Sequence, residues 1–285
     1  MLILFFLIGL FVVIDIVRGY LKTKDKKKYL VSNLAGTAIV VVLLFLFGPL
    51  FVLSPIKLGY SSLKEGNIIL YYPAGRIDFA RDMMEKIKIA EKDNRDFYKT
   101  TTSMPIIMAF SKLDMLRFGA PPDAGGVGNE LAVIVNERKV SVNVIAHEMS
   151  HRNLRYITGK IFPVPNWFDE GMASYIGKMN YYAGRTDLKR ELEEGRYHRD
   201  ITKLRGVFGT TGWLKIVFID KRSRSVYGQT YEMIKYLFDK YGQDKVYNFV
   251  LSVKNTDFDT AFKNSFVMTP EEFHQEFISN LQASP

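Results

Sequence analysis

The chain has 285 residues with 47% hydrophobic composition and no cysteine, so neither a disordered chain nor a disulfide scaffold is expected. Its net charge of +9 is divided into +4 over residues 1–54 and +5 over residues 55–285. Because no RRM, KH or zinc-finger spacing accompanies this modest charge, we expect no nucleic-acid partner.

Two apolar runs occupy the N-terminal part of the chain. Residues 34–53 form a run of twenty residues without a charge, which as a helix would match the apolar thickness of a bilayer. Residues 1–17 are apolar apart from Asp15, and we interpret them as a second, shorter span. A cleaved signal peptide is the alternative, but no basic segment precedes this run and no small-residue cleavage site follows it. Residues 1–54 are therefore predicted to form a transmembrane helical hairpin.

The loop between the two runs, residues 18–29, carries six Lys or Arg side chains with Asp25 as its only acid. Short basic loops remain on the cytoplasmic side of a membrane. We therefore expect a cell-membrane protein with two spans and with residues 55–285 on the extracytoplasmic side. The lysines would also serve as an anchor to anionic lipids.

Residues 55–285 are predicted to form one α+β domain in which strands come first and helices later. Apolar runs bounded by turn residues predict strands at 66–72, 104–110 and 131–136, with a Gly/Pro-rich loop at 119–128. Apolar residues at helical spacing predict helices at 78–98, 141–156, 169–179, 187–194, 226–241, 244–254 and 270–281. This order indicates a small mixed sheet that leads into a helical lobe.

The predicted helix 141–156 contains an H-E-x-x-H sequence, formed by His147, Glu148 and His151. Residues four apart lie one above the other on a helix, so both imidazoles can reach one metal ion, while Glu148 lies on the adjoining side. The ordinary alternative is a solvated helix face with a chance pair of histidines. The spacing favours a metal site.

A catalytic zinc needs a third protein ligand, and Glu170 can supply it from the first turn of a following helix. Glu170 follows His151 after eighteen intervening residues, which is enough for one helix to end and another to begin. Acidic residues at a helix start are otherwise common, because they stabilise its N-terminus. The metzincin pattern is excluded, because it requires glycine and histidine where the chain has Leu154 and Ile157.

The H-E-x-x-H sequence, the eighteen-residue spacer and the W-x-D-E-G-x-A setting of Glu170 resemble the gluzincin clan of zinc metallopeptidases. Aminopeptidase-N-type and peptidase-MA-like domains are the most similar, and the match covers residues 147–175. The resemblance implies a thermolysin-like fold with a helical lobe closing the cleft. It also implies that His147, His151 and Glu170 bind one Zn²⁺ while Glu148, the catalytic residue, takes a proton from water activated by the metal.

In the aminopeptidase-like families a tyrosine at the start of a later helix stabilises the oxyanion of the reaction. The resemblance implies Tyr227 in this catalytic role, with Tyr231 as the reserve donor. Both could instead be core residues four apart on one helix face. The substrate-amine motif G-x-M-E-N is absent, since residues 126–130 read G-V-G-N-E, and aminopeptidase specificity is therefore in doubt.

The strand at 131–136 could receive an extended peptide by edge pairing. This interpretation makes three residues substrate-binding candidates: Leu131, Val133 and Val135. The alternative is a buried core strand.

Three further polar residues have weaker functional signals. Ser174 follows Glu170 by four residues and could hydrogen-bond a metal ligand, although such a serine is more often merely solvated. His198 and His274 have no partner at ligand spacing, and we expect them at the surface.

Together these features predict a membrane-anchored zinc metallopeptidase that acts on protein or peptide substrates, with one Zn²⁺ per chain. The alternative from another class is a catalytically silent pseudoprotease that binds peptides or assembles a membrane complex, and the intact Glu148 argues against it. An intramembrane protease does not fit, because the H-E-x-x-H sequence lies about ninety residues past the second apolar run in a polar stretch.

Overall fold

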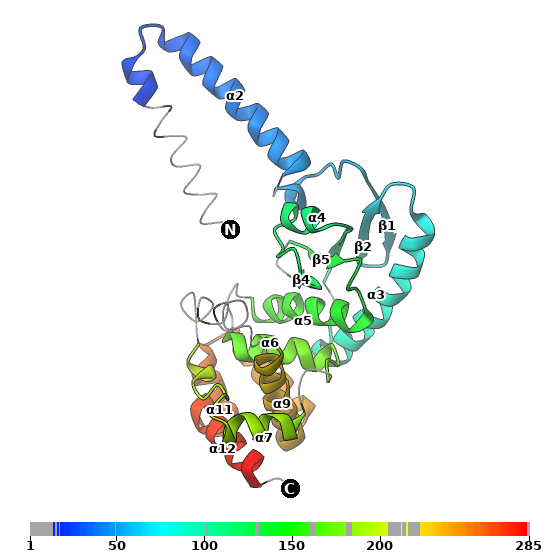
Figure 1. The fold of residues 1–285 in the computed structure, drawn as a ribbon, viewed down its shortest axis with the longest axis vertical. Coiled ribbons are helices and arrows are strands. Elements are labelled where there is room, and N and C mark those ends of the chain that lie inside the picture. Colours follow the sequence, from blue (N-terminus) through cyan, green and yellow to red (C-terminus); the bar gives the residue numbers. More distant parts are fainter. Residues whose placement is uncertain are drawn as a thin grey trace.

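The computed structural model describes residues 14, 16, 18–48, 50–100, 102–128, 131–159, 164–180, 184–204, 212, 215 and 223–283. It has a mixed α/β architecture in which a five-stranded sheet lies beside a lobe of helices, and a long N-terminal helix projects away from both (Figure 1). The expected order of strands followed by helices is confirmed. A thermolysin-like fold in particular stays a prediction.

The projecting helix is α2, Lys26–Phe47, and by length and composition it could cross a membrane. The Asp25 side chain caps its start by accepting a hydrogen bond from the Lys28 amide at 3.0 Å. The helix begins before the predicted run 34–53. It also ends before that run does, because Gly48 caps it and Phe51–Leu53 form a separate 3-10 turn. The predicted first span, residues 1–17, lies outside the described residues except for 14 and 16.

The sheet has the strand order β1-β2-β3-β5-β4. Its central strands β2 (Ile68–Pro73), β3 (Met104–Ala109) and β5 (Val133–Asn136) are mutually parallel and confirm the three predicted strands. The two edge strands, β1 (Tyr60–Glu65) and β4 (Gly126–Gly128), pair antiparallel with their neighbours. Neither edge strand was predicted, because β1 is rich in polar residues and β4 is a three-residue strand inside a glycine-rich loop.

Both faces of the sheet are covered. Alternate residues of the parallel strands face α3 (Ile77–Tyr98) and α5 (Val142–Thr158), and they include Ile106, Met108, Val133 and Val135. The intervening residues face the short helix α4 (Lys112–Arg117) and Phe51, and they include Ile107, Ala109 and Ile134. The sheet is therefore the central layer of the first half of the domain.

A buried polar network fixes α5 against α3. The Tyr98 hydroxyl and Ser150 Oγ lie 2.7 Å apart, and the Asn94 amide donates to the Ala146 carbonyl at 2.9 Å. Asn153 donates to the Asn94 side-chain oxygen at 3.0 Å. A buried polar group that loses its hydrogen-bond partner destabilises the folded protein. These bonds therefore restrict both rotation and sliding of α5.

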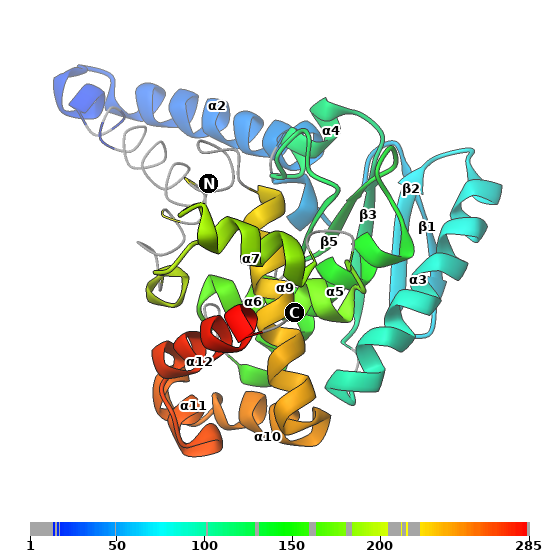
Figure 2. The same ribbon diagram turned by 60° about the horizontal axis from the view of Figure 1, so that its bottom comes forward.

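The lobe is formed by the later helices, and Figure 2 shows α5 between the sheet and this lobe. The lobe contains α6 (Asn166–Ile176), α7 (Arg185–Glu193), α9 (Ser223–Tyr241), α10 (Gln243–Ser252), α11 (Phe258–Phe266) and α12 (Pro270–Ala283). Its core is rich in aromatic side chains, among them Trp167, Phe168, Phe249, Phe262 and Phe273. The predicted helices of this region are present, and α11 was not predicted.

Candidate metal centre

The candidate site lies where the first turn of α6 meets the middle of α5. Ser141 caps α5 by accepting a hydrogen bond from the Val144 amide, and Gly159 ends the helix with a φ of 65°. The Asn143 side chain donates to the carbonyls of Gly177 and Lys178, which ties the end of α6 to the start of α5. These contacts bring the first turn of α6 close to the histidine-bearing face of α5.

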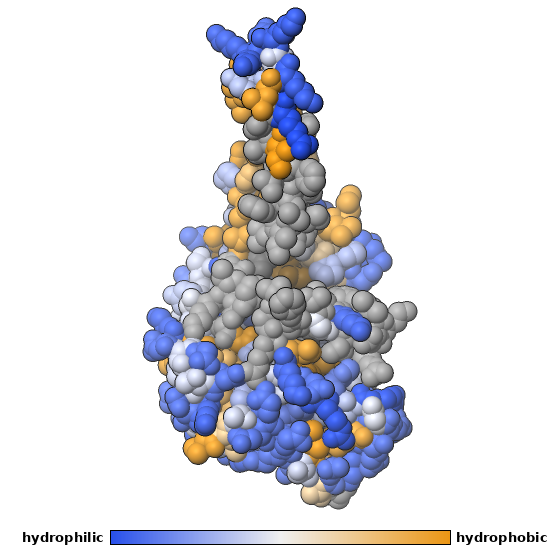
Figure 3. Space-filling view, turned by 90° about the vertical axis from the view of Figure 1, so that its left-hand side faces the viewer, coloured by the Kyte–Doolittle hydropathy of each residue, from blue (hydrophilic) through white to orange (hydrophobic). Residues whose placement is uncertain are grey.

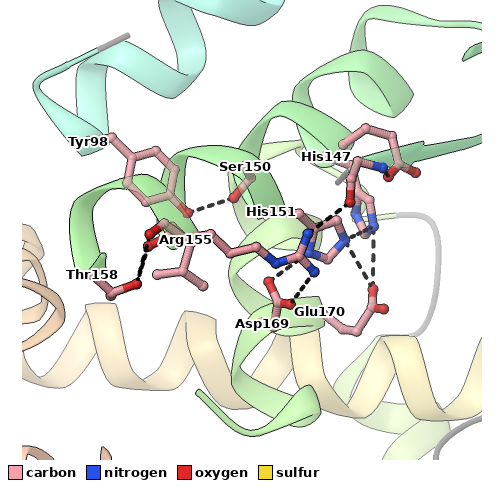
Figure 4. Close-up of polar contacts among 11 residues, drawn as sticks. Tyr98, His147, Ser150, His151, Arg155, Thr158, Asp169 and Glu170 are labelled. Carbon is pink, nitrogen blue, oxygen red and sulfur yellow. Dashed lines mark hydrogen bonds and ion pairs between the residues drawn. The ribbon is translucent and has the colours of Figure 1, made fainter. Parts of the chain in front are cut away.

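The three predicted metal ligands converge (Figure 4). The Nε2 atoms of His147 and His151 are 3.2 Å apart, and Glu170 Oε2 lies 3.4 Å and 3.6 Å from them respectively. Zinc binds histidine nitrogen and carboxylate oxygen at about 2.0–2.2 Å in tetrahedral geometry, which separates neighbouring ligand atoms by about 3.3 Å. The observed separations therefore fit three corners of such a tetrahedron, and the group could hold a metal ion.

The hydrogen-bonding capacity of these atoms also fits a cation. His151 Nδ1 lies 2.6 Å from Asp169 Oδ1, so a proton on Nδ1 leaves the lone pair of Nε2 directed at the other two ligand atoms. Glu170 Oε2 is buried and accepts no hydrogen bond within the described part of the chain. A metal ion would satisfy both atoms at once.

Negative charge dominates the electrostatics around His151. Burial by itself lowers the pKa of His151, but Asp169 and Glu170 outweigh it and raise the pKa to about 9. Burial raises the pKa of the Asp169 carboxyl, but the nearby positive charges of His151 and Arg155 hold this pKa below its usual value. A field that keeps a proton on His151 also attracts a metal cation.

Glu148 lies on the side of α5 that faces β4. Its Oε2 accepts a hydrogen bond from the Gly128 amide at 2.6 Å, and the side chain is almost fully buried. Burial raises the pKa of this carboxyl, against the opposing charges of the two histidines. A raised pKa suits a group that must accept and release a proton near neutral pH.

Glycine is required where β4 approaches α5. A Cβ atom at Gly128 would lie 2.1 Å from the Glu148 carbonyl oxygen, and one at Gly126 would lie 2.8 Å from Glu148 Cγ. Both separations are too short for non-bonded atoms. The glycines of the G-V-G segment therefore allow the edge strand to contact the backbone of the motif helix.

The two predicted tyrosines occupy different positions on α9. The ring of Tyr227 lies beside that of His147, with the centroids 6.3 Å apart. The ring of Tyr231 is instead 6.1 Å from that of Tyr175. Gly171 makes this placement possible, because a Cβ atom there would lie 2.7 Å from the Thr230 carbonyl and would push α9 away from α6.

The predicted substrate strand needs correction. β5 is hydrogen-bonded to β3 on one side and to β4 on the other, and Val133 and Val135 are both fully buried. These two valines are core residues and cannot pair with a peptide, while Leu131 is exposed but precedes the strand. The edge on this side of the sheet belongs to β4.

Two further expectations were wrong. The buried Ser174 hydroxyl has no hydrogen-bond partner among the residues that the structure describes, so it does not hydrogen-bond His147, His151 or Glu170. His274 is 1% exposed instead of lying at the surface, and its Nε2 is 3.0 Å from the Tyr197 hydroxyl. His198 is half-buried. Asn129 and Glu130 lie outside the described residues.

The sequence interpretation assigned no role in the site to Asp169, Arg155 or Gly128. Asp169 supports His151, and Arg155 lies 3.6 Å from Asp169 while donating to the Gly128 carbonyl at 3.0 Å. The position of Asp169 directly before Glu170 could have indicated a role in the site, but an acidic residue at a helix start also has an ordinary explanation. Arg155 and Gly128 had none, since their contacts join segments far apart in the sequence.

No protein-family model matches the chain. The chain is similar to an uncharacterized protein of Bacillus subtilis (strain 168), YhcO, with 21% identity over 227 residues, covering 79% of this chain and 60% of that protein. The chain thus spans about three fifths of the length of this curated relative. Because the relative is itself uncharacterized, the similarity assigns no function.

Proposed function

We propose that the protein is a membrane-anchored, zinc-dependent metallopeptidase with a thermolysin-like arrangement of sheet, motif helix and lobe. The proposal depends on one observation: His147 Nε2, His151 Nε2 and Glu170 Oε2 lie within 3.6 Å of one another. The Glu148 carboxylate is on α5, the helix that carries both histidines. Two histidines and one glutamate are a ligand set of catalytic zinc, which leaves a fourth position for water or substrate.

A zinc ion held by these residues would polarise the scissile carbonyl and lower the pKa of water from about 15.7 to about 7. Glu148 is the general base in this proposal, since its buried carboxylate has a raised pKa. Asp169 fixes the orientation of the His151 ring. Tyr227, whose ring lies beside that of His147, is proposed to donate a hydrogen bond to the developing oxyanion.

The substrate is proposed to be a protein or peptide that binds as an extended chain along β4. The Gly128 amide and carbonyl are directed at Glu148 and Arg155 instead of at β5, so this edge faces the catalytic carboxylate. Because these two groups of Gly128 are already bonded, the peptide would pair with the remainder of β4, which would orient it through its main chain and leave selectivity to its side chains. The proposed substrate strand is therefore β4 and not the predicted strand β5.

The membrane part of the proposal is that α2 crosses the bilayer. The chain would then have two spans with the basic residues 18–29 in the cytoplasm, and the metal centre would lie on the extracytoplasmic side. Support comes from the length and apolar composition of α2 and from the lack of buried side chains along this helix in the described part of the chain. Protease accessibility of the C-terminus in sealed vesicles tests the side.

The test uses the full-length protein purified in detergent. We expect one zinc per chain by elemental analysis and hydrolysis of a fluorogenic peptide library. Glu148→Gln should keep the metal and lose hydrolysis, while His147→Ala should lose both. Glu85→Gln, an exposed carboxylate on α3, is the matched control and should change neither. An active Glu148→Gln protein would contradict the mechanism, and zinc without turnover on any peptide would support the pseudoprotease instead.

A further inference from the structure

Side-chain contacts join the end of α2 to the domain. Arg117 of α4 donates to the Leu46 carbonyl in the last turn of α2 at 2.5 Å, and its guanidinium lies 3.9 Å from the centre of the Phe51 ring. Phe51 is fully buried and stacks on Phe118 with the ring centroids 5.2 Å apart. Lys57 Nζ donates to the carbonyls of Phe51, Val52 and Ser54. The Arg117 bond and the burial of Phe51 therefore attach the domain to the end of α2.

Five large apolar side chains are exposed around this junction. Leu113 and Leu116 are 74% and 54% exposed, and because they are three residues apart they share one face of α4. The segment that follows α2 contributes the other three, Leu53, Ile56 and Leu58, which are 48%, 62% and 45% exposed. We call these five residues the collar. Figure 1 shows α4 beside the base of α2, and Figure 3 shows hydrophobic side chains where the helical stalk meets the body.

We propose that the collar is a membrane-contact surface, seated in the interfacial region of the leaflet from which α2 emerges. This inference rests on the proposal that α2 crosses the bilayer, and it adds a contact made by the folded domain itself. The collar adjoins the end of α2, because Arg117, on the same helix as Leu113 and Leu116, bonds to the Leu46 carbonyl, and Lys57 holds the segment 51–54 that follows α2. Clustered apolar side chains exposed beside a span are stabilised by lipid and not by water.

The charges at the junction fit an interfacial position. Arg117 and Lys57 bond to backbone carbonyls, so their charges are compensated close to the apolar surface. Lys112, which precedes Leu113, is 63% exposed and forms an ion pair with Asp123 at 2.7 Å. A lysine with this exposure can extend its ammonium group toward lipid headgroups while its stem stays beside the leucines.

Contact through the collar would hold the metal centre at a constant height above the bilayer. The peptide bonds that reach it would then belong to segments at that height, such as juxtamembrane stretches of other membrane proteins. This consequence narrows the proposed substrate class and does not depend on the identity of the metal.

The absence of native cysteine makes a direct test possible. Single cysteines at Val41, Leu113 and Val267 are labelled with an environment-sensitive fluorophore in the full-length protein, reconstituted in vesicles that contain nitroxide-labelled lipids. Val41 lies in the middle of α2, and Val267, 87% exposed at the end of α11, is the control far from α2. We expect lipid nitroxides to quench the labels at 41 and 113, the latter from a shallow depth, and to leave the label at 267 unaffected.

Three results would overturn the proposal. A label at 113 that behaves like the one at 267 while 41 is quenched would show that α2 spans but the collar stays in water. A failure to quench 41 would remove the span on which the collar depends, whether or not the protein is a peptidase. Efficient disulfide cross-linking between two Leu113→Cys chains would identify a second copy as the occupant.

Discussion

His151 and Asp169 are held together by a hydrogen bond of 2.6 Å between Nδ1 and Oδ1, whereas the buried Nδ1 of His147 has no hydrogen-bond partner among the described residues. The two histidines are therefore supported unequally. Asp169 fixes the ring and the tautomer of one of them, and a carboxylate in this position also makes the imidazole a stronger base toward a metal. Asp169 is accordingly the most informative residue outside the ligand set.

We predict that Asp169→Asn lowers zinc affinity by about 10- to 100-fold, because the amide keeps the shape of the side chain but not its charge. Competition with a chromophoric chelator measures the change. Asp187→Asn on α7, where the carboxylate pairs with the exposed Arg190, is the control and should leave the affinity unchanged. Equal affinity of wild type and Asp169→Asn would show that the hydrogen bond does not tune the site.

Tyr227→Phe should reduce kcat by about 10²- to 10³-fold, the effect of removing one oxyanion donor, with zinc content and KM little changed. The reason is its ring contact with His147, which Tyr231 does not share. Tyr231→Phe, one helical turn away, is the matched control. Comparable losses of kcat in the two variants would indicate a packing role for both tyrosines.

Gly128→Ala should displace β4 from α5, because the added Cβ would lie 2.1 Å from the Glu148 carbonyl oxygen. We expect a loss of about 1–3 kcal/mol in the free energy of unfolding, the usual range for overpacking, together with a lower kcat. Chemical denaturation of the full-length protein in detergent measures the first quantity. Gly125→Ala is the control, since its Cβ would meet no atom closer than 3.4 Å.

The bond between Tyr98 and Ser150 can be measured by a double-mutant cycle. Tyr98→Phe or Ser150→Ala alone leaves one buried hydroxyl unpaired, and each should destabilise the protein by about 1–3 kcal/mol. The double variant removes both hydroxyl groups and should cost less than the sum of the single changes. Strict additivity would mean that the two hydroxyls do not interact.

His274 predicts a pH dependence of folding. Burial lowers the pKa of His274 to about 4 from its usual 6.5, so the unfolded chain binds the proton more readily than the folded one. The folded protein therefore has its full stability, as far as His274 is concerned, above pH 6.5. As the pH falls from 6.5 to 4, the free energy of unfolding decreases by up to about 3 kcal/mol.

The measurement compares urea unfolding of wild type and His274→Gln between pH 7 and 4, with chelator present, using tryptophan fluorescence, to which the buried Trp167 contributes. Other groups titrate in both proteins, and the difference between the two slopes isolates His274. The wild type should lose more stability on acidification than the variant. Parallel curves would show that His274 binds its proton equally readily in the folded and the unfolded chain.

The sequence predicted the elements that have strong local signals. α3, α5 and α9 follow from apolar residues at helical spacing, and the central strands follow from continuous apolar runs. β4 has no such signal, because its formation depends on the close approach of Gly128 to the backbone of Glu148 and on pairing with β5. Periodicity does not report contacts of this kind.

The candidate site was predictable in part for the same reason. His147 and His151 are on one helix, so their proximity follows from spacing, and Glu170 follows from the demand for a third ligand. The strand order is set by tertiary pairing, and this is why Val133 and Val135 were assigned to an edge that belongs to β4. His274 was misplaced because a single polar residue on an amphipathic helix does not show whether it has a buried partner such as Tyr197.

Arg155 connects two parts of the molecule through one guanidinium, since it bonds to the Gly128 carbonyl and pairs with the Asp169 carboxylate. A peptide that shifts β4 on binding would change the position of this cation, and with it the charge that His151 experiences through Asp169. Peptide occupancy and metal affinity are then thermodynamically linked, and each ligand must change the binding constant of the other by the same factor.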